Sequence, residues 1–225
     1  MNKNGISFGI IGIVIGLTVG FFGANYLNRN AENAGAGAPL QPQVPANMPS
    51  QGNIPSGAPL ADVQKVLDRA KEEPENYQAQ IEAGEMYTKI QRFDQALPFY
   101  EAAQKLKPAD LNSNIVLGNG YFDAKQYEKA ETYYAKALEI DPKNVGVRTD
   151  YGLTFFLREP SDPERSIMEY RKALEIDPKH ELTLQNLSAA LKEKGDKEEL
   201  IKTLAALKEV NPNNKVIKQL ESDPQ

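Results

Sequence analysis

The sequence contains no cysteine, no tryptophan and only one histidine, His180. Without cysteine, disulfide bonds, thiolate nucleophiles and Cys-based metal sites are excluded. A single histidine also leaves catalytic triads and His-based metal sites without their parts. No Gly-rich loop of the kind that cradles phosphates is present. The composition therefore predicts a protein that is not an enzyme and carries no metal and no cofactor.

Charge is almost absent from residues 1–60, where only Lys3, Arg29 and Glu32 are charged. The acidic excess behind the net charge of −5 therefore lies in the rest of the chain. A mildly acidic domain argues against a nucleic-acid partner, because phosphates call for a concentrated basic surface. Residues 1–60 instead hold ten of the 16 glycines and six of the 15 prolines, so the chain falls into two parts of different composition.

Residues 5–27 form an uncharged and mostly apolar segment. As a helix it would be about 34 Å long, enough to cross a hydrocarbon core of about 30 Å. A cleaved signal peptide is the alternative, because Lys3 supplies a positive start and residues 34–36 read Ala-Gly-Ala. The apolar run is longer than a signal peptide needs, which favours a single-pass membrane anchor. Lys3 before the span weakly places the rest of the protein outside the cytoplasm, on the periplasmic side of an envelope.

Glycines recur on one face of this predicted helix, among them Gly12, Gly16 and Gly20. Glycine lets helix backbones approach closely in lipid, so this face is a candidate for helix packing and for homo-oligomer formation. The alternative is that glycine is simply frequent in membrane helices.

Residues 28–60 are rich in Ala, Gly, Pro, Gln and Asn and show no helical or strand periodicity. Such a segment buries too little apolar area to offset the entropy of ordering it, so we expect a disordered tether. A Pro-rich ligand is the alternative, but no Pro-x-x-Pro core with flanking basic residues is present.

Internal repetition is the strongest signal in the chain. The eight residues KALEIDPK occur at 136–143 and again at 172–179, which is a spacing of 36. Four prolines each close an amphipathic stretch and follow one another at nearly constant intervals: Pro108, Pro142, Pro178 and Pro212. Since proline disfavours a helical conformation in the residue before it, each of the four predicts a helix end.

Small and aromatic residues recur in register with these prolines. The second repeat shows the full pattern: Leu117-Gly118, Tyr121, Ala130, Tyr134, Ala137 and Pro142. The first and third repeats keep most of it, with Gly84 and Tyr100 in one and Gly152 and Tyr170 in the other. The order and spacing resemble the tetratricopeptide repeat (TPR), a helix-turn-helix unit. The resemblance implies an all-α fold, an α-solenoid of stacked hairpins.

The register divides the chain after the tether into six segments. They are a leading helix at 61–76, four repeats at 77–110, 111–144, 145–180 and 181–214, of which the last is degenerate, and a short capping helix with a tail at 215–225. His180 is expected to be an exposed linker residue.

In TPR proteins that this chain resembles, the first helix of each repeat lines a concave groove that holds a peptide or a partner helix. Carried over by register, the groove residues are Gln78, Ile81, Glu85, Thr88, Asn112, Ile115, Asn119, Phe122, Thr149, Leu153, Phe156 and Gln185. Amides can bond to a peptide backbone while the aromatic side chains bury apolar groups. The alternative is that Phe122, Leu153 and Phe156 belong to the core between repeats.

Taken together, the segments predict a membrane-anchored scaffold or adaptor that binds a protein or peptide partner. The order of anchor, tether and repeats looks broadly like the anchored TPR component of bacterial cytochrome c maturation, although no residue specifies that partner. A structural protein that oligomerises through the glycine face of the anchor is the second hypothesis, and a receptor facing the cytoplasm is the third.

Overall fold

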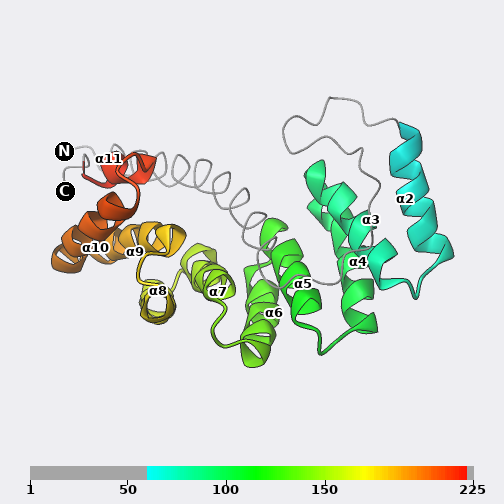
Figure 1. The fold of residues 1–225 in the computed structure, drawn as a ribbon, viewed down its shortest axis with the longest axis horizontal. Helices are drawn as coiled ribbons and strands as arrows, with labels where there is room; N and C mark the ends of the chain where they lie inside the picture. Colours follow the sequence, from blue (N-terminus) through cyan, green and yellow to red (C-terminus); the bar gives the residue numbers. More distant parts are fainter. Residues whose placement is uncertain (1–59, 222–225) are drawn as a thin grey trace, which may run out of the picture. The chain divides into compact units, whose positions relative to one another are not determined.

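The computed structural model describes residues 60–221, and all regular structure within that range is helical. The predicted all-α solenoid of stacked hairpins is confirmed for this part of the chain (Figure 1). Its helices are α2 (Leu60–Glu72), α3 (Tyr77–Lys89), α4 (Phe93–Leu106), α5 (Leu111–Asp123), α6 (Tyr127–Ile140), α7 (Val145–Leu157), α8 (Pro163–Ile176), α9 (Glu181–Lys194), α10 (Lys197–Val210) and α11 (Lys215–Glu221).

The predicted anchor and tether lie outside the described residues, as do Gly12, Gly16 and Gly20. Within residues 60–221, no helix is both long enough and apolar enough to cross a bilayer.

Each repeat is a hairpin of two helices: α3–α4, α5–α6, α7–α8 and α9–α10. A side-chain cap begins the first helix of every repeat. Asn76, Asp110 and Asn144 accept hydrogen bonds from the backbone N–H three residues on, at 3.1, 2.9 and 3.1 Å. These caps satisfy donors that the helix itself cannot pair.

His180 takes the same capping place in the fourth repeat. Its Nδ1 accepts from the backbone N–H of Thr183 at 3.3 Å and lies 2.6 Å from the hydroxyl of that residue. The expectation of an exposed linker residue was therefore wrong: His180 is half-buried at the start of α9. Histidine is not among the usual capping residues, so its presence before a helix does not predict a cap.

The turn between the two helices of a hairpin needs a left-handed backbone in three of the four repeats. Gln91 and Lys125 have φ of 58° and Gly195 has φ of 80°. The third repeat is two residues longer than the other three, and its extra residues make a longer loop around Pro160 instead.

Close packing of glycine against tyrosine joins the two helices of a hairpin. Gly118 on α5 lies against the ring of Tyr134 on α6, and Gly152 on α7 lies against Tyr170 on α8 in the same way. Both tyrosines are fully buried, and so is Ala130. The small residues therefore let the two helices of a hairpin cross closely.

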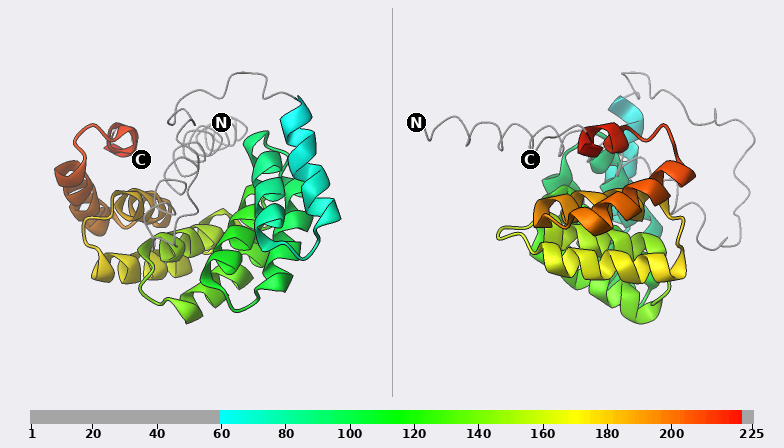
Figure 2. Two further views of the ribbon diagram at one scale, coloured as in Figure 1. Left: turned by 45° about the vertical axis from the view of Figure 1, so that its right-hand side comes forward. Right: turned by 90° about the vertical axis from the view of Figure 1, so that its left-hand side faces the viewer.

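Neighbouring hairpins share a continuous core. Ile167 and Tyr170 of the third repeat cluster with Leu187, Ala190 and Leu191 of the fourth. Two further clusters, under α2 and under α11, extend this core to the two ends of the array: Ala70, Ala79 and Ala83, and Leu184, Leu207 and Ile217. The hairpins follow one another in chain order, so that each contacts the next along a curved row (Figure 2).

Candidate protein-binding face

The first helices of the repeats, α3, α5, α7 and α9, lie on the inner side of the row, and the second helices lie on its outer side (Figure 2). We call the surface formed by α3, α5, α7 and α9 the inner face. The predicted groove residues all come from these four helices, but they differ greatly in exposure. Gln78, Glu85 and Asn112 are exposed, whereas Thr88, Asn119 and Phe156 are half-buried. The remaining six are buried: Ile81, Ile115, Phe122, Thr149, Leu153 and Gln185.

All three exposed members lie on the first two repeats, and the two amide side chains among them are held by neighbours. Asn112 donates its side-chain N–H to the hydroxyl of Tyr77 at 3.1 Å, which links the starts of α5 and α3. Gln78 donates to Glu82 at 3.2 Å. Amide groups on this part of the inner face are therefore oriented and still solvent-exposed, as recognition of a peptide backbone requires.

Two half-buried members are fixed by the tyrosines beneath them. Thr88 shares a hydrogen bond of 2.9 Å with the hydroxyl of Tyr100, and Asn119 accepts one of 2.8 Å from Tyr134. The packing tyrosine of each hairpin thus reaches from the second helix to the inner face. Because the oxygen of Asn119 is used by Tyr134, its amide N–H₂ group is the part that remains suited to a ligand.

Phe122 and Leu153 are 0% and 1% exposed, so they are core residues. The ring of Phe122 packs edge-on against Tyr127 with centroids 5.4 Å apart. Phe156 is partly buried and packs against the cluster that contains Ile167 and Tyr170. Of the two interpretations left open by the sequence, the core interpretation therefore fits Phe122 and Leu153, whereas Phe156 contacts the core and is only half-buried.

The polar members of the buried set bond within the protein. Thr149 shares a 2.6 Å hydrogen bond with Thr183 of the next repeat and donates to the carbonyl of Val145 at 2.8 Å. Gln185 accepts from Asn214 at 3.2 Å. Thr149 and Gln185 are thus bonded within the protein, and Thr149 links the third repeat to the fourth.

Electrostatics distinguish Glu85 from the amides around it. Partial desolvation of its carboxylate raises the pKa of Glu85; Lys89 acts against the rise, and the nearby Glu82 adds to it. Arg69 of α2 is bonded to Glu82 at 3.2 Å. Among the described residues, Glu85 has no hydrogen-bond or ion-pair partner, which leaves its carboxylate open to a ligand.

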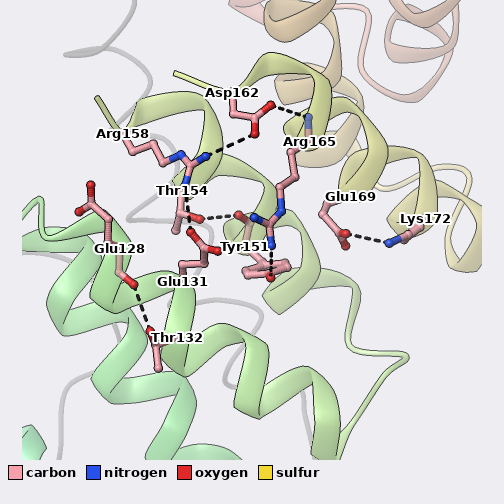
Figure 3. Close-up of polar contacts among 10 residues, drawn as sticks. All are labelled: Glu128, Glu131, Thr132, Tyr151, Thr154, Arg158, Asp162, Arg165, Glu169 and Lys172. Atoms are coloured by element: carbon pink, nitrogen blue, oxygen red, sulfur yellow. Dashed lines mark hydrogen bonds and ion pairs between the residues drawn. The ribbon is translucent and has the colours of Figure 1, made fainter. Parts of the chain in front are cut away.

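A charged network that the sequence did not predict lies where the second and third repeats meet (Figure 3). Glu131 on α6 forms ion pairs with Arg158 at 3.4 Å and with Arg165 at 3.3 Å. Both guanidinium groups stack on the buried ring of Phe155, at 5.2 and 4.0 Å from its centroid. Asp162, the cap of α8, pairs with Arg158 at 3.3 Å. In the sequence, only the position of the two arginines on either side of the longer loop could have indicated this network. The ion pairs connect that loop to α6.

A cleft of about 540 Å³ lies between the hairpin turns of the first two repeats. Its walls carry charges of both signs from Arg92, Asp94, Asp123 and Lys125. No group of three His, Asp or Glu side chains that could hold a metal ion occurs in residues 60–221. The cleft therefore offers charged and amide side chains.

Comparison with known proteins agrees with this geometry. Two protein-family models, both described as tetratricopeptide repeat, match this chain, one over residues 51–110 and the other over residues 115–144. The chain therefore contains tetratricopeptide repeats, and the described part is a TPR solenoid. Proteins built from this repeat are generally scaffolds for protein–protein interaction rather than enzymes.

Solved structures of MamA are similar in fold. The crystal structure of MamA protein has a TM-score of 0.60 at 17% identity and covers 72% of this chain and 85% of that one. The structure of MamA from residue 41 to the end, from Desulfovibrio magneticus RS-1, has a TM-score of 0.63 at 18% identity. It covers 71% of this chain and 89% of that one. At these identities the likeness shows the fold alone. A search of curated proteins gives no match.

Proposed function

We propose that this protein is a membrane-tethered adaptor that binds an extended segment of a partner protein on the inner face of its first two repeats. The observation that carries the proposal is the set of exposed polar side chains on α3 and α5, Gln78, Glu85 and Asn112. Asn112 is held in place by Tyr77, and the carboxylate of Glu85 has a raised pKa and no partner among the described residues. Pre-oriented polar groups on a rigid helix lower the entropy cost of binding.

The tether and anchor complete the proposed arrangement. The predicted tether of about 33 residues would have a typical end-to-end distance of roughly 30 Å, so an anchored solenoid would work close to the membrane. The charge before residue 5 favours a solenoid outside the cytoplasm. A role in cytochrome c maturation stays a prediction from the order of segments.

Site-specific photo-crosslinking tests the proposal. A photoreactive residue is placed in the full-length protein in its membrane, at Gln78 or Asn112 on the inner face and at Thr132 or Lys136 on α6 as controls. The proposal expects a discrete adduct from the inner-face positions, lost when Asn112→Ala and Glu85→Gln are combined. Adducts of equal yield from α6, or adducts unchanged by the double substitution, would contradict it. Protease accessibility of the solenoid in intact cells tests the topology separately.

A further inference from the structure

The packing tyrosine of the third repeat differs from those of the first two in what its hydroxyl group meets. In the first two repeats a polar residue of the first helix, Thr88 or Asn119, bonds to this hydroxyl. Counted from the start of the repeat, the same places on α7 hold Phe156 and Leu153, whose side chains neither donate nor accept. The hydroxyl of Tyr170 is accordingly buried with no hydrogen-bond partner among the described residues.

A second unpaired polar group lies beside this hydroxyl. Asn186 of α9 is 1% exposed, and neither its amide oxygen nor its amide nitrogen has a hydrogen-bond partner in the described part of the chain. It is close enough to Tyr170 to act on the pKa of the hydroxyl, but it does not reach hydrogen-bonding distance. Because burying unpaired amides and hydroxyls is unfavourable, two of them side by side indicate a place for a further hydrogen-bonding group.

Asp150 of α7 brings a negative charge to the same place. Burial raises the pKa of Tyr170 well above its ordinary value, and the charge of Asp150 adds to the rise. Asp150 therefore makes the electrostatic potential at the hydroxyl more negative. A cation is favoured there over a neutral or an anionic group. We call Asp150, Tyr170 and Asn186 the polar cluster.

The polar cluster lies toward the inner side of the third and fourth repeats. Asp150 and Asn186 hold the same place in their repeats, on α7 and α9, which both lie on the inner side of the row (Figure 2). In the first two repeats this place belongs to Glu82 and Val116, and both are half-buried. Asp150 is 5% exposed and Tyr170 is fully buried, so Asp150 is the member nearest the solvent.

The oxygen atoms of the polar cluster define the chemistry of a suitable ligand. The carboxylate of Asp150, the amide oxygen of Asn186 and the hydroxyl oxygen of Tyr170 can all accept hydrogen bonds. A lysine ammonium group is a compact cation with three donors on a flexible four-carbon stem, so it matches three acceptors and reaches inward through a narrow opening. Leu153, one helical turn from Asp150, provides an apolar wall for the stem.

We propose that the polar cluster is a pocket for a lysine side chain of the bound partner segment. The proposal rests on the proposed function in one respect, namely that the segment runs along the inner face. It adds the residue that the third and fourth repeats select in that segment. The alternative is that the polar cluster holds only buried water, which satisfies such groups in many proteins.

Two short peptides test the pocket. They have the same serine and glycine residues around a central residue, which is lysine in one and norleucine in the other. Norleucine keeps the four-carbon stem and lacks the ammonium group. Binding to the full chain in nanodiscs of zwitterionic lipid is measured by ligand-detected NMR. The lysine peptide is expected to bind at least about tenfold more tightly than the norleucine peptide.

Substitutions then assign the preference to the polar cluster. Asp150→Asn and Tyr170→Phe should each reduce the preference for lysine to less than about threefold. Tyr134→Phe, the same change in the second repeat, is the matched control and should keep the preference. The double variant Asn112→Ala with Glu85→Gln should also keep it, because these residues lie on the first two repeats. The pocket and the site on the first two repeats can therefore fail separately.

Urea denaturation of the two tyrosine variants tests the unpaired hydroxyl without any ligand. Tyr134→Phe should lower the midpoint, because it removes the bond to Asn119, whereas Tyr170→Phe should leave the midpoint unchanged or raise it. An equal fall in both variants would show that the hydroxyl of Tyr170 is bonded within the protein. That result, equal affinity of the wild type for both peptides, no binding of the lysine peptide at about 5 mM, or an unchanged preference in Asp150→Asn would overturn the proposal.

Discussion

A β-carbon placed on Gly118 would lie 2.8 Å from two ring atoms of Tyr134, so the crossing of α5 and α6 has room for glycine at this position and for nothing larger. The tyrosine cannot easily move away, because its ring is fully buried and its hydroxyl is bonded to Asn119 at 2.8 Å. The same crossing therefore holds the hairpin together and positions a residue of the inner face.

Gly118→Ala is expected to lower the free energy of unfolding by about 1–3 kcal/mol, since the added methyl group must displace the tyrosine ring or the helix. Urea denaturation followed by far-UV circular dichroism measures the change. In a Tyr134→Leu background the same alanine should cost at least about 1 kcal/mol less, because the smaller side chain leaves room for it. An equal cost in both backgrounds would show that the ring is not what excludes the methyl group.

Gly195→Ala tests the cost of a left-handed backbone conformation alone, because the added methyl group meets no neighbouring atom. Nothing lies within 4 Å of a β-carbon at this position, so the cost comes only from the positive φ of 80°. We expect a loss of about 1 kcal/mol. Lys125→Ala is the matched control, because Lys125 already holds φ of 58° with a β-carbon present, and its stability should stay within about 0.5 kcal/mol of wild type. Similar losses in both variants would exclude the conformational explanation.

The features that the sequence predicted well are those that recur. Gly118 and Tyr134 have the same separation along the chain as Gly84 and Tyr100, and this repetition indicated a repeated unit of two helices. The prolines likewise marked the helix ends. Features that no repeated residue type marks were missed: the histidine cap at His180, the left-handed turns at Gln91 and Lys125, and the pairing of Glu131 with two arginines. Each depends on backbone or side-chain geometry that the residue types do not reveal.

For the candidate site, register predicted which helices form the inner face but not which side chains remain exposed there. Phe122 and Asn112 both come from predicted groove positions of α5, yet Phe122 is buried and Asn112 is exposed. Exposure is set by how closely neighbouring helices pack over each residue, and this depends on contacts with other helices, such as that of Tyr127 with Phe122. A helical wheel contains no information about those neighbours.

Arg148→Met tests the buried ion pair between Arg148 and Glu169. Arg148 bonds to Glu169 at 2.8 Å and to the carbonyl of Pro142 at 2.7 Å, and Glu169 is only 4% exposed. Removal of the arginine leaves a buried carboxylate with only Lys172, so we expect a loss of about 2–3 kcal/mol in the free energy of unfolding.

Two further variants separate the explanations for that loss. Lys172→Met should cost less than about 1 kcal/mol, because the side chain of Lys172 is 46% exposed. Replacing both partners, with Arg148→Met and Glu169→Leu, should cost less than Arg148→Met alone, since no unpaired charge is left inside the protein. If the double variant proves less stable than the single one, the pair stabilises the fold beyond the cost of its own desolvation.

The difference in stability between the Glu85→Gln variant and the wild type should depend on pH in a defined direction. The pKa of Glu85 is raised above 4.5 in the folded state, mainly by desolvation, so the folded protein binds the carboxyl proton more tightly than the unfolded chain does. Ionised Glu85 therefore destabilises the fold above this range, and the penalty disappears as the pH falls below 4.5, where the group is protonated in both states. The glutamine variant should consequently be more stable than wild type at pH 7 and equally stable at about pH 3.5. Glu139→Gln, at an exposed position on α6, is the control for the change from glutamate to glutamine itself.

The same pair of proteins tests whether Glu85 belongs to the proposed inner-face site. A ligand that places a cation beside Glu85 would lower its pKa again, because an opposite charge favours the ionised carboxylate. The wild-type protein should therefore regain the lost stability on binding, while the glutamine variant should not. Thermal unfolding at pH 7 with and without the captured partner segment measures this difference. A gain of equal size in both proteins would separate binding from the carboxylate and remove Glu85 from the proposed site.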